Sequence, residues 1–394
     1  MAFHRYLPIV LSAFLTWHTP VTADPLTFWD QKQRGANSFN NAPPDKAYFA
    51  ALADTGATWV RLVFSKWDSN ERDFLIGSAD TYDGLVAADV AVVQNVLDVA
   101  DAAGIGVVLT PLTVPGSRWI QQNDGQFDDR LWSDPVHADQ FVAFWRDVAV
   151  EFAGHPAIVA YNLLNEPVPE KTTGLPENAA MEVYQKWQAD HAGGTRDLPA
   201  LYTRTIAAIR EIDAQTPIML DAGFYANPRA LATWPAPMAD NRVLYSVHMY
   251  EPYAATSPRN LRRDTPLRYP GTTLTYAGEQ QVWGRDQVAA HLQIGFDWAA
   301  SHGIPSNRVV LSEFGCMRRW VDCGTYLTDV IDAAEAADVH WAFYAFREDE
   351  WDGMDYELPP SLAPGRFYWL SESGRADKLP RDGELMTLIK GYME

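Results

Sequence analysis

The sequence predicts an α/β fold, a (β/α)8 TIM barrel in a single domain. Eight short apolar runs alternate with longer segments that carry apolar residues on one face, which is the order of strands and helices in such a barrel. The chain has 394 residues, and barrels run from about 200 to more than 400 residues as one unit. A doubly wound open sheet is the alternative, but no glycine-rich phosphate loop follows the first expected strand.

The apolar runs are the expected strands, because they are short and rich in valine, leucine and isoleucine. They lie at 35–39, 58–64, 105–112, 157–165, 217–221, 243–250, 308–313 and 339–346. The amphipathic segments are the expected helices, at 45–54, 86–103, 138–153, 200–213, 286–302, 326–337 and 383–392. Gly104, Gly154 and Gly303 follow three of these helices, where glycine readily forms a left-handed cap.

Two connections are unusually long, 167–199 after the fourth strand and 251–285 after the sixth. A further connection, 224–241, is rich in proline and only weakly helical. In a barrel, the segments that follow strands lie at the carboxyl-terminal face, where substrates bind. We therefore expect the two long connections to border the functional site.

The first 23 residues are typical of a secretory signal peptide. A polar start at His4-Arg5 precedes an apolar run, and Val21-Thr22-Ala23 resembles a small-residue cleavage site. The run is about half the ~20 residues that a membrane span needs. We expect a signal peptide at 1–23 and a secreted or periplasmic catalytic domain at 24–394; an uncleaved amphipathic anchor is the alternative.

The chain is strongly acidic, with 51 acidic and 31 basic residues and a formal net charge of -20. Such a surface repels nucleic acid and anionic lipid. It also disfavours a strongly anionic polysaccharide, although a local basic cleft would override the global field. The 15 tryptophans offer flat faces for sugar rings, or else pack in the core. We expect a neutral polysaccharide as partner, no nucleic acid, no membrane contact after cleavage, and a monomer.

The chain has two cysteines, Cys316 and Cys323. An exported chain meets oxidising conditions, so we expect a disulfide between them, with two buried thiols as the alternative. No Cys/His cluster has zinc-like spacing, and neither an HExxH motif nor an EF-hand loop is present. We therefore expect no metal and no organic cofactor.

Polar side chains fall at the carboxyl-terminal ends of several expected strands, or interrupt them. They are Arg61, Asn165, Glu166, His248, Tyr250 and Glu313. In a barrel these side chains converge above one axis. Two carboxylates over one pocket suit glycoside hydrolysis, because one protonates the leaving oxygen while the other attacks the anomeric carbon or activates water. A salt bridge at a strand end is the alternative for either glutamate alone.

Several of these motifs resemble those of the cellulase family, glycoside hydrolase family 5. Residues 161–167 (YNLLNEP) look like its strand-four Asn-Glu-Pro motif, and 311–315 (LSEFG) are similar to its strand-seven Glu-Phe-Gly motif. His248-Met249-Tyr250 resembles its strand-six His-x-Tyr. Arg61 resembles its strand-two arginine, and Arg34-Gly35-Ala36-Asn37 its first-strand opening. The ordered set spans nearly the whole chain after the signal peptide.

The resemblance implies a retaining hydrolase in which Glu166 is the acid/base and Glu313 the nucleophile. Glu166 would need a raised pKa to hold its proton. Glu313 would stay ionised, helped by the charge of Arg61. Retention places the two carboxyl groups roughly 5–5.5 Å apart.

The remaining positions are expected to bind substrate. Asn165 would bond the sugar 2-hydroxyl, an interaction that strengthens in the transition state. Tyr250 would hydrogen-bond the nucleophile, and His248 would position substrate or support Glu166. We also place Arg61 and Asn37 in this group.

The aromatic positions depart from the family pattern. The tryptophan that usually ends strand eight is replaced by Tyr344, and Trp351 in the following loop would take its place or pack under that loop. Trp119, after strand three, is either a stacking surface for a sugar or a packing residue. These departures leave the identity of the sugar open.

The leading hypothesis is an endo-acting β-glycanase on β-1,4-glucan or β-mannan. An exo-acting β-glycosidase on short oligosaccharides is the second enzymatic interpretation. A non-catalytic sugar-binding barrel and a metal-dependent barrel hydrolase are the alternatives from other classes.

Overall fold

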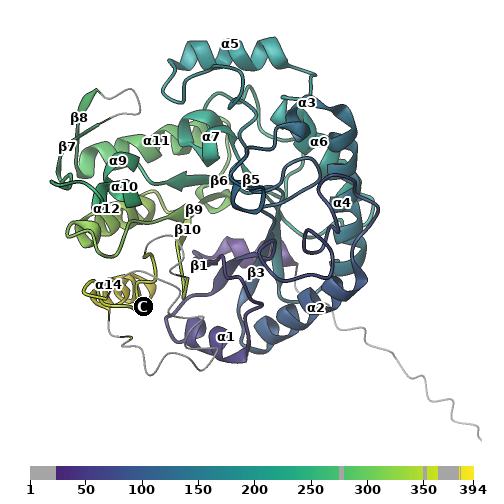
Figure 1. Ribbon diagram of the computed structural model, residues 1–394, viewed down its shortest axis with the longest axis horizontal. Helices are drawn as coiled ribbons and strands as arrows, with labels where there is room; N and C mark the ends of the chain where they lie inside the picture. Colours follow the sequence, from purple (N-terminus) through teal and green to yellow (C-terminus); the bar gives the residue numbers. More distant parts are fainter. Residues whose placement is uncertain (1–23, 275–278, 349–352, 363–380, 382) are drawn as a thin grey trace, which may run out of the picture.

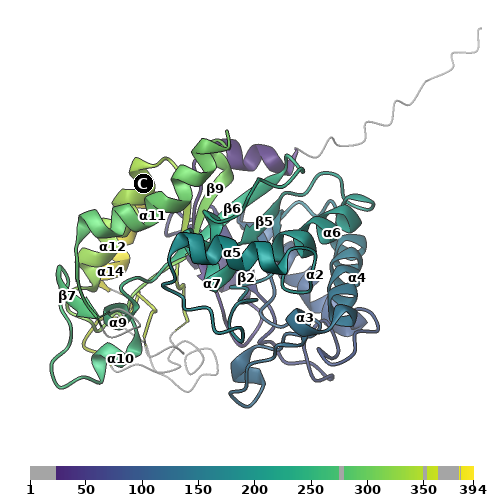
Figure 2. The ribbon, with the colours of Figure 1, turned by 90° about the horizontal axis from the view of Figure 1, so that it is seen from above.

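A computed structural model describes residues 24–274, 279–348, 353–362, 381 and 383–394. Within them, eight parallel strands close into a barrel in the order β1-β10-β9-β6-β5-β4-β3-β2, with helices around it (Figures 1 and 2). The predicted (β/α)8 barrel is confirmed. Its strands are β1 (Arg34–Ser38), β2 (Trp59–Val63), β3 (Gly106–Thr110), β4 (Ile158–Asn162), β5 (Ile218–Asp221), β6 (Val243–Met249), β9 (Val309–Phe314) and β10 (His340–Phe343).

Helices of two or more turns pack around the strands or cover the loops. They are α1 (Lys46–Ala53), α2 (Ala87–Ala102), α4 (Pro135–Phe152), α5 (Met181–His191), α6 (Leu198–Arg210), α11 (Arg285–Ser301), α12 (Cys323–Ala336) and α14 (Glu384–Met393). Shorter turns are η1 (Pro25–Asp30), η2 (Ile120–Gln122), α3 (Arg130–Ser133), α7 (Gly223–Ala226), α8 (Pro228–Leu231), α9 (Tyr253–Thr256), α10 (Pro258–Leu261) and η3 (Ser306–Arg308).

The lower half of the barrel interior is apolar. Trp29, carried by η1, is fully buried, donates its indole N–H to the carbonyl of Val159 (2.9 Å) and packs edge-on against Trp59 (ring centroids 5.2 Å). It belongs to a cluster with one inward residue from most strands: Trp59, Val108, Ala160, Met219, Leu244, Val310 and Ala342. This layer closes the amino-terminal end of the barrel.

The next inward layer is polar. Because side chains of a strand alternate between its faces, the residues two positions further along share the interior. These are Asn37, Arg61, Thr110, Asn162, Asp221, Ser246 and Ser312, all fully buried. Hydrogen-bonding groups therefore form a layer directly beneath the carboxyl-terminal ends of the strands.

The long connections contain elements that periodicity did not predict. α5 lies in the connection after β4, and only Tyr184 among its residues is buried, so its apolar pattern is weak. An antiparallel hairpin, β7 (Gly271–Leu274) with β8 (Gln280–Trp283), lies in the connection after β6. α4 begins earlier than expected, because the Asp134 side chain caps it and Pro135 takes its first position.

The predicted disulfide between Cys316 and Cys323 is confirmed, with a Cα–Cα distance of 5.7 Å. It ties the loop after β9 to the start of α12. The expected signal peptide at 1–23 lies outside the described residues. In the part of the chain that the structure describes, no helix combines the length and apolar character needed to cross a bilayer.

Removing this disulfide should destabilise the fold. A Cys316→Ala/Cys323→Ala variant should lose about 2–3 kcal/mol of unfolding free energy, because the loop closed in the unfolded chain is short. Urea denaturation with and without reductant measures the loss. Reductant should lower the stability of the wild type but not of the variant; equal stability of both under oxidising conditions would contradict the prediction.

Candidate active site

A cavity of about 340 Å³ opens over the carboxyl-terminal end of the barrel. The predicted residues Asn165, Glu166, His248, Tyr250 and Glu313 all line it. Aromatic residues from the surrounding loops form much of the remaining wall: Phe39, Trp119, Phe224, Tyr225, Tyr253 and Tyr344. The loops after β4 and β6 contribute to the wall, as the long connections predicted.

Glu166 lies four residues beyond the end of β4 in a left-handed conformation (φ 50°). This conformation is uncommon for a residue with a side chain. It is held in part by the backbone N–H of Glu166, which donates to the carboxylate of Asp221 (3.2 Å). The turn directs the Glu166 carboxyl group into the cavity.

Glu313 lies within β9, which fixes its backbone by pairing with β6. One oxygen of its carboxylate accepts from the guanidinium of Arg61 (2.9 Å), and the other accepts from the hydroxyl of Tyr250 (2.6 Å). Both donors hold the carboxylate in one orientation. The predicted hydrogen bond from Tyr250 to Glu313 is present.

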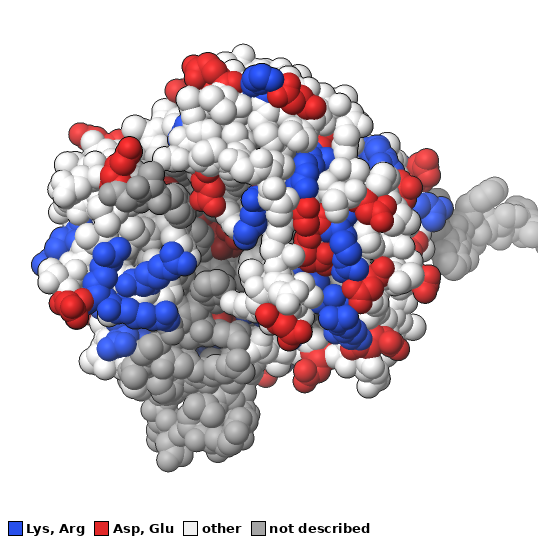
Figure 3. All heavy atoms as spheres, turned by 45° about the horizontal axis from the view of Figure 1, so that its top comes forward, with Lys and Arg blue, Asp and Glu red and all other residues white. Residues whose placement is uncertain are grey.

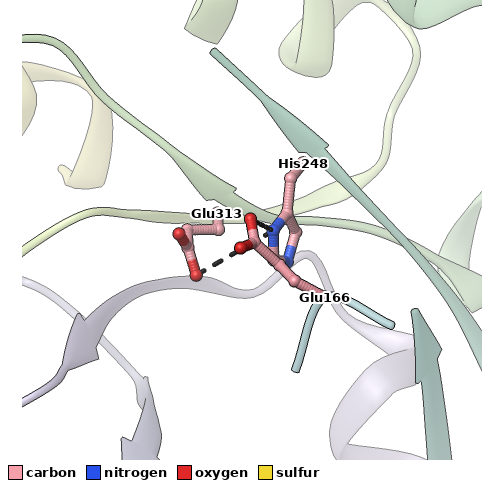
Figure 4. A group of neighbouring side chains, drawn as sticks. All are labelled: Glu166, His248 and Glu313. Atoms are coloured by element: carbon pink, nitrogen blue, oxygen red, sulfur yellow. Dashed lines mark hydrogen bonds and ion pairs between the residues drawn. The ribbon is translucent and has the colours of Figure 1, made fainter. Parts of the chain in front are cut away.

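Glu166 and Glu313 face each other with His248 beside them (Figure 4). The Nδ1 atom of His248 lies 2.9 Å from Oε1 of Glu166 and 3.9 Å from Oε2 of Glu313. One oxygen of each glutamate and one ring nitrogen all lie within 4.8 Å of one another. The three side chains therefore converge on one small volume.

The environment of Glu166 favours its protonated form. Burial raises the pKa of Glu166 to about 8; the charge of Arg61 opposes this shift and that of Asp221 adds to it. Burial lowers the pKa of His248, which favours the neutral imidazole, whereas the charges of Glu313 and Asp221 act in the opposite direction. Its Nε2 lies 3.5 Å from the Asp221 carboxylate, whose pKa is below its ordinary value despite burial because the charge of Arg61 and the backbone N–H of Glu166 favour the charged form. When Glu166 is protonated and the imidazole is neutral with its proton on Nε2, Nδ1 can accept from the Glu166 hydroxyl.

Burial also raises the pKa of Glu313, while His248, Arg61 and the Tyr250 hydroxyl act in the opposite direction. Arg61 is hydrogen-bonded to Glu313, whereas no hydrogen bond joins Arg61 to Glu166 among the described residues. A cation in direct contact favours the ionised form most strongly. Of the two coupled carboxyls, Glu313 is therefore the one that ionises first.

Among the described residues, the group with the spacing to hold a metal ion consists of Glu166, His248 and Glu313. Arg61 already places a positive charge 2.9 Å from Glu313. A dication in the same volume would be repelled by that charge at short range. The donor set fits proton transfer better than metal binding.

The structure places Arg61 and Asn37, which we expected to bind substrate, in the polar layer beneath the cavity. Both are fully buried and neither lines the cavity. The Asn37 amide donates to the backbone carbonyls of Ser312 (2.9 Å) and Phe343 (3.2 Å), joining β1 to its neighbours. These two side chains therefore support the site from below.

Two supporting residues, Asp221 and Asn162, were missed by the sequence analysis. Asp221 ends β5, accepts from Arg61 (3.0 Å) and from Asn162 (3.2 Å), and lies under Glu166. Asn162 in turn accepts from the Nε of Arg61 (2.9 Å). Both fit the rule that polar strand-end residues mark the site, so the signal was present in the sequence.

A further buried carboxyl, Glu170, supports the cavity wall from the loop after β4. It accepts from the hydroxyl of Tyr184 and from the backbone N–H of Phe224 (3.3 Å), and burial raises its pKa to about 7. A Cβ atom at Gly223 would lie 2.0 Å from a Glu170 oxygen, so only glycine fits there. Three left-handed residues follow, Phe224 to Ala226, and place Phe224 and Tyr225 in the wall.

Of the aromatic positions predicted from the sequence, Trp119 and Tyr344 line the cavity. Tyr344 packs edge-on against Phe39 (4.8 Å between centroids), which sequence reasoning missed, and its hydroxyl donates to Glu348 (2.8 Å). Trp351 lies outside the described residues.

A (β/α)8 barrel in which a half-buried and a buried carboxyl face each other over the strand ends defines the class of barrel glycosidases. The model of the family "Cellulase (glycosyl hydrolase family 5)" matches residues 22–350. The chain belongs to this family.

Similar proteins include Endoglucanase C of Acetivibrio thermocellus, 24% identical over 230 residues, which are 58% of this chain and 57% of that protein. The chain thus spans less than two thirds of that relative. Among solved structures, one titled as a glycoside hydrolase has a TM-score of 0.63 at 22% identity, covering 92% of this chain and 99% of the other. Endoglucanase Cel5A from Thermotoga maritima has a TM-score of 0.58 at 17% identity, with 82% and 93% covered.

Replacing Arg61 should leave two carboxylates of the barrel interior without a positive partner. In Arg61→Met, Asp221 and Glu313 lose their shared cation, which should lower the unfolding free energy by about 3–5 kcal/mol and raise the pKa of Glu313 further. Urea denaturation measures the first effect, and an upward shift of the acidic limb of kcat/KM measures the second. Arg146→Met, at an exposed position of α4, is the control; stability equal to that control would refute the role of Arg61.

Proposed function

We propose that this chain hydrolyses β-linked glucan by double displacement with retention of configuration, with Glu313 as nucleophile and Glu166 as acid/base. The main observation in support is the short distance between the two carboxyl groups. One oxygen of Glu166 lies within 4.8 Å of one oxygen of Glu313. Retaining enzymes hold their carboxyl groups about 5–5.5 Å apart, and inverting enzymes about 6.5–9.5 Å, leaving room for a water molecule. The close approach supports direct attack by Glu313.

In the first step, the Glu313 carboxylate attacks the anomeric carbon while Glu166 protonates the glycosidic oxygen. The bond from the sugar to its leaving oxygen breaks, and a glycosyl ester forms on Glu313. Arg61 and Tyr250 hold the attacking carboxylate. Because its pKa is raised, Glu166 carries at neutral pH the proton that it donates.

Asn165 is oriented for the sugar 2-hydroxyl. Its Oδ1 accepts from the guanidinium of Arg61 (2.7 Å), and a guanidinium can only donate. The amide N–H groups therefore point elsewhere, and Asn165 lines the cavity. They are free to donate to a hydroxyl that gains negative character in the transition state.

In the second step, water replaces the leaving group. Ester formation neutralises Glu313, which removes a negative charge next to Glu166 and favours its ionised form. Glu166 then accepts a proton from water, the hydroxide attacks the anomeric carbon, and the carboxylate of Glu313 leaves. His248 contacts Glu166 through Nδ1, and a proton on Nδ1 would let the ring donate to the ionised carboxylate.

Endoglucanase names among the relatives favour internal cleavage of a glucan, and a similar solved structure titled as an endo-β-1,4-glucanase favours the β-1,4 linkage. Mannan is the second candidate, since one solved structure of Thermotoga maritima Cel5A is titled as a complex with mannotriose and another as one with cellobiose. Hydrolysis of both polymers beside aryl β-cellobioside separates these substrates, and the rate on polymer relative to aryl glycoside separates endo from exo action.

We also propose that the chain is exported and acts in the periplasm or outside the cell. The apolar amino-terminal run and its cleavage motif support this. The disulfide between Cys316 and Cys323 is the kind of bond that persists in oxidising compartments. Amino-terminal sequencing of the exported protein, expected to begin at Asp24, tests the proposal.

Replacing the two glutamates should have different effects. Glu313→Ala should lower kcat on every substrate by about 5 kcal/mol or more in barrier, since the covalent step is lost. Glu166→Ala should slow polymer hydrolysis far more than hydrolysis of activated aryl glycosides, whose leaving groups need no protonation. Steady-state rates measure both, with the exposed Glu151→Ala on α4 as control. Small, equal losses in the two variants would refute the assignment.

The pH profile should report the raised pKa of Glu166. Because the acid must carry its proton, kcat/KM should fall as pH rises through about 8. Glu166→Gln, assayed on an activated aryl glycoside, should lose this basic limb while keeping the acidic limb set by Glu313. A basic limb that persists in the variant would assign it to another group.

A further inference from the structure

Five exposed arginines gather beside the cavity in this acidic protein. We call them the arginine patch: Arg259, Arg262, Arg263, Arg268 and Arg319. Residues 258–274 alone carry four of them and a single acidic residue, Asp264, whereas the whole chain has a formal net charge of -20. Figure 3 shows basic side chains gathered on the side of the molecule where Figure 1 places α9 and α10.

The patch adjoins the cavity through two loops. Arg259 follows Pro258, which lines the cavity, and Arg319 lies two residues after Met317, which also lines it. The charge of Arg259 lowers the pKa of Tyr253, a third lining residue, in opposition to the larger effect of burial. The patch is therefore electrostatically coupled to the cavity wall.

The two loops are fastened to each other. The backbone N–H of Met317 donates to the carbonyl of Thr256 (3.3 Å), and the indole of Trp320 donates to the carbonyl of Leu267 (2.9 Å). The disulfide closes the loop that carries Arg319. The backbone segments that carry the arginines are thus held in place beside the cavity.

Not all of this charge is neutralised within the protein. Arg268 forms an ion pair with Asp322 (2.7 Å). Arg259, Arg263 and Arg319 have no carboxylate within 4.0 Å in the described ranges of the chain. Neighbouring cations repel one another, and an anion bound among them would relieve that repulsion.

The patch and the proposed acid/base border the same cavity. Tyr253 and Pro258, which precede the patch in the chain, line this cavity together with Glu166. The acid/base protonates the leaving oxygen, so the leaving part of the sugar chain would begin beside Glu166. A sugar chain that continued past Tyr253 and Pro258 would reach Arg259.

We propose that the arginine patch binds anionic substituents on the leaving-group portion of the substrate, so that the enzyme acts on an acidic β-glucan. This inference rests on the proposed hydrolase function and names its substrate class. The arginine patch is a local basic surface. Its field would attract an anionic polysaccharide despite the net negative charge of the whole chain. A planar guanidinium suits a carboxylate substituent, because it donates two parallel hydrogen bonds.

The test compares two soluble β-1,4-glucans, carboxymethyl cellulose and neutral hydroxyethyl cellulose. In Arg259→Glu/Arg263→Glu, kcat/KM on carboxymethyl cellulose at low salt should fall about 10-fold or more, with less than about a twofold change on hydroxyethyl cellulose. Salt at about 0.5 M should shrink the difference between variant and wild type, because exposed charges are then screened. Thermal denaturation checks that the variant is folded.

The control carries the same change of charge at positions that do not line the cavity. Lys46→Glu/Arg146→Glu alters two exposed positions, on α1 and α4, and should leave the preference for carboxymethyl cellulose intact. Equal losses on both polymers, or the same loss in the control, would overturn the proposal. So would patch-dependent binding to vesicles of anionic lipid with unchanged kinetics on carboxymethyl cellulose. Failure of the wild type to cleave hydroxyethyl cellulose and aryl β-cellobioside would instead refute the hydrolase function itself.

Discussion

The guanidinium group of Arg61 is buried at the centre of the barrel and is bound on all sides by side chains from other strands. It donates to Glu313, Asn165 and Asp221 at 2.7–3.0 Å, and also to Asn162 and Asn37. Removing a full charge from water costs several kcal/mol, which only a complete set of partners offsets. Because those partners lie on or next to β1, β4, β5 and β9, the geometry of the two reactive carboxyls depends on closure of the barrel.

The same burial has different consequences for the two carboxyls because their neighbours differ. Glu313 receives hydrogen bonds from Arg61 and Tyr250, which favour the carboxylate. Glu166 contacts neutral His248 and has the Asp221 carboxylate beneath its backbone, which favours the protonated acid. The proposed acid and the proposed nucleophile are thus distinguished by their surroundings, as two identical side chains must be for acid and nucleophile to coexist.

The sequence could predict the strands, since their runs are apolar and short, and it could predict Glu166 and Glu313, since both follow such runs. It could not predict how far each inward residue lies below the cavity, because that depends on the register between strands. Asn37 and Arg61 face each other in one layer, and this layer lies below the lining of the cavity. Glu170 lies in a loop without periodicity, and its approach to Gly223 joins two distant segments.

The positive groups of this acidic protein act over different ranges. Arg61 is sealed from solvent, so its contact with Glu313 at 2.9 Å is little affected by dissolved salt. The arginine patch is exposed, so its field reaches into solution and is screened over about 10 Å at 0.1 M salt. In the proposed function, chemistry and capture of substrate would therefore be carried by separate charges. The first is fixed by the strands of the barrel, whereas the second belongs to loops, which can vary without disturbing the carboxyl pair.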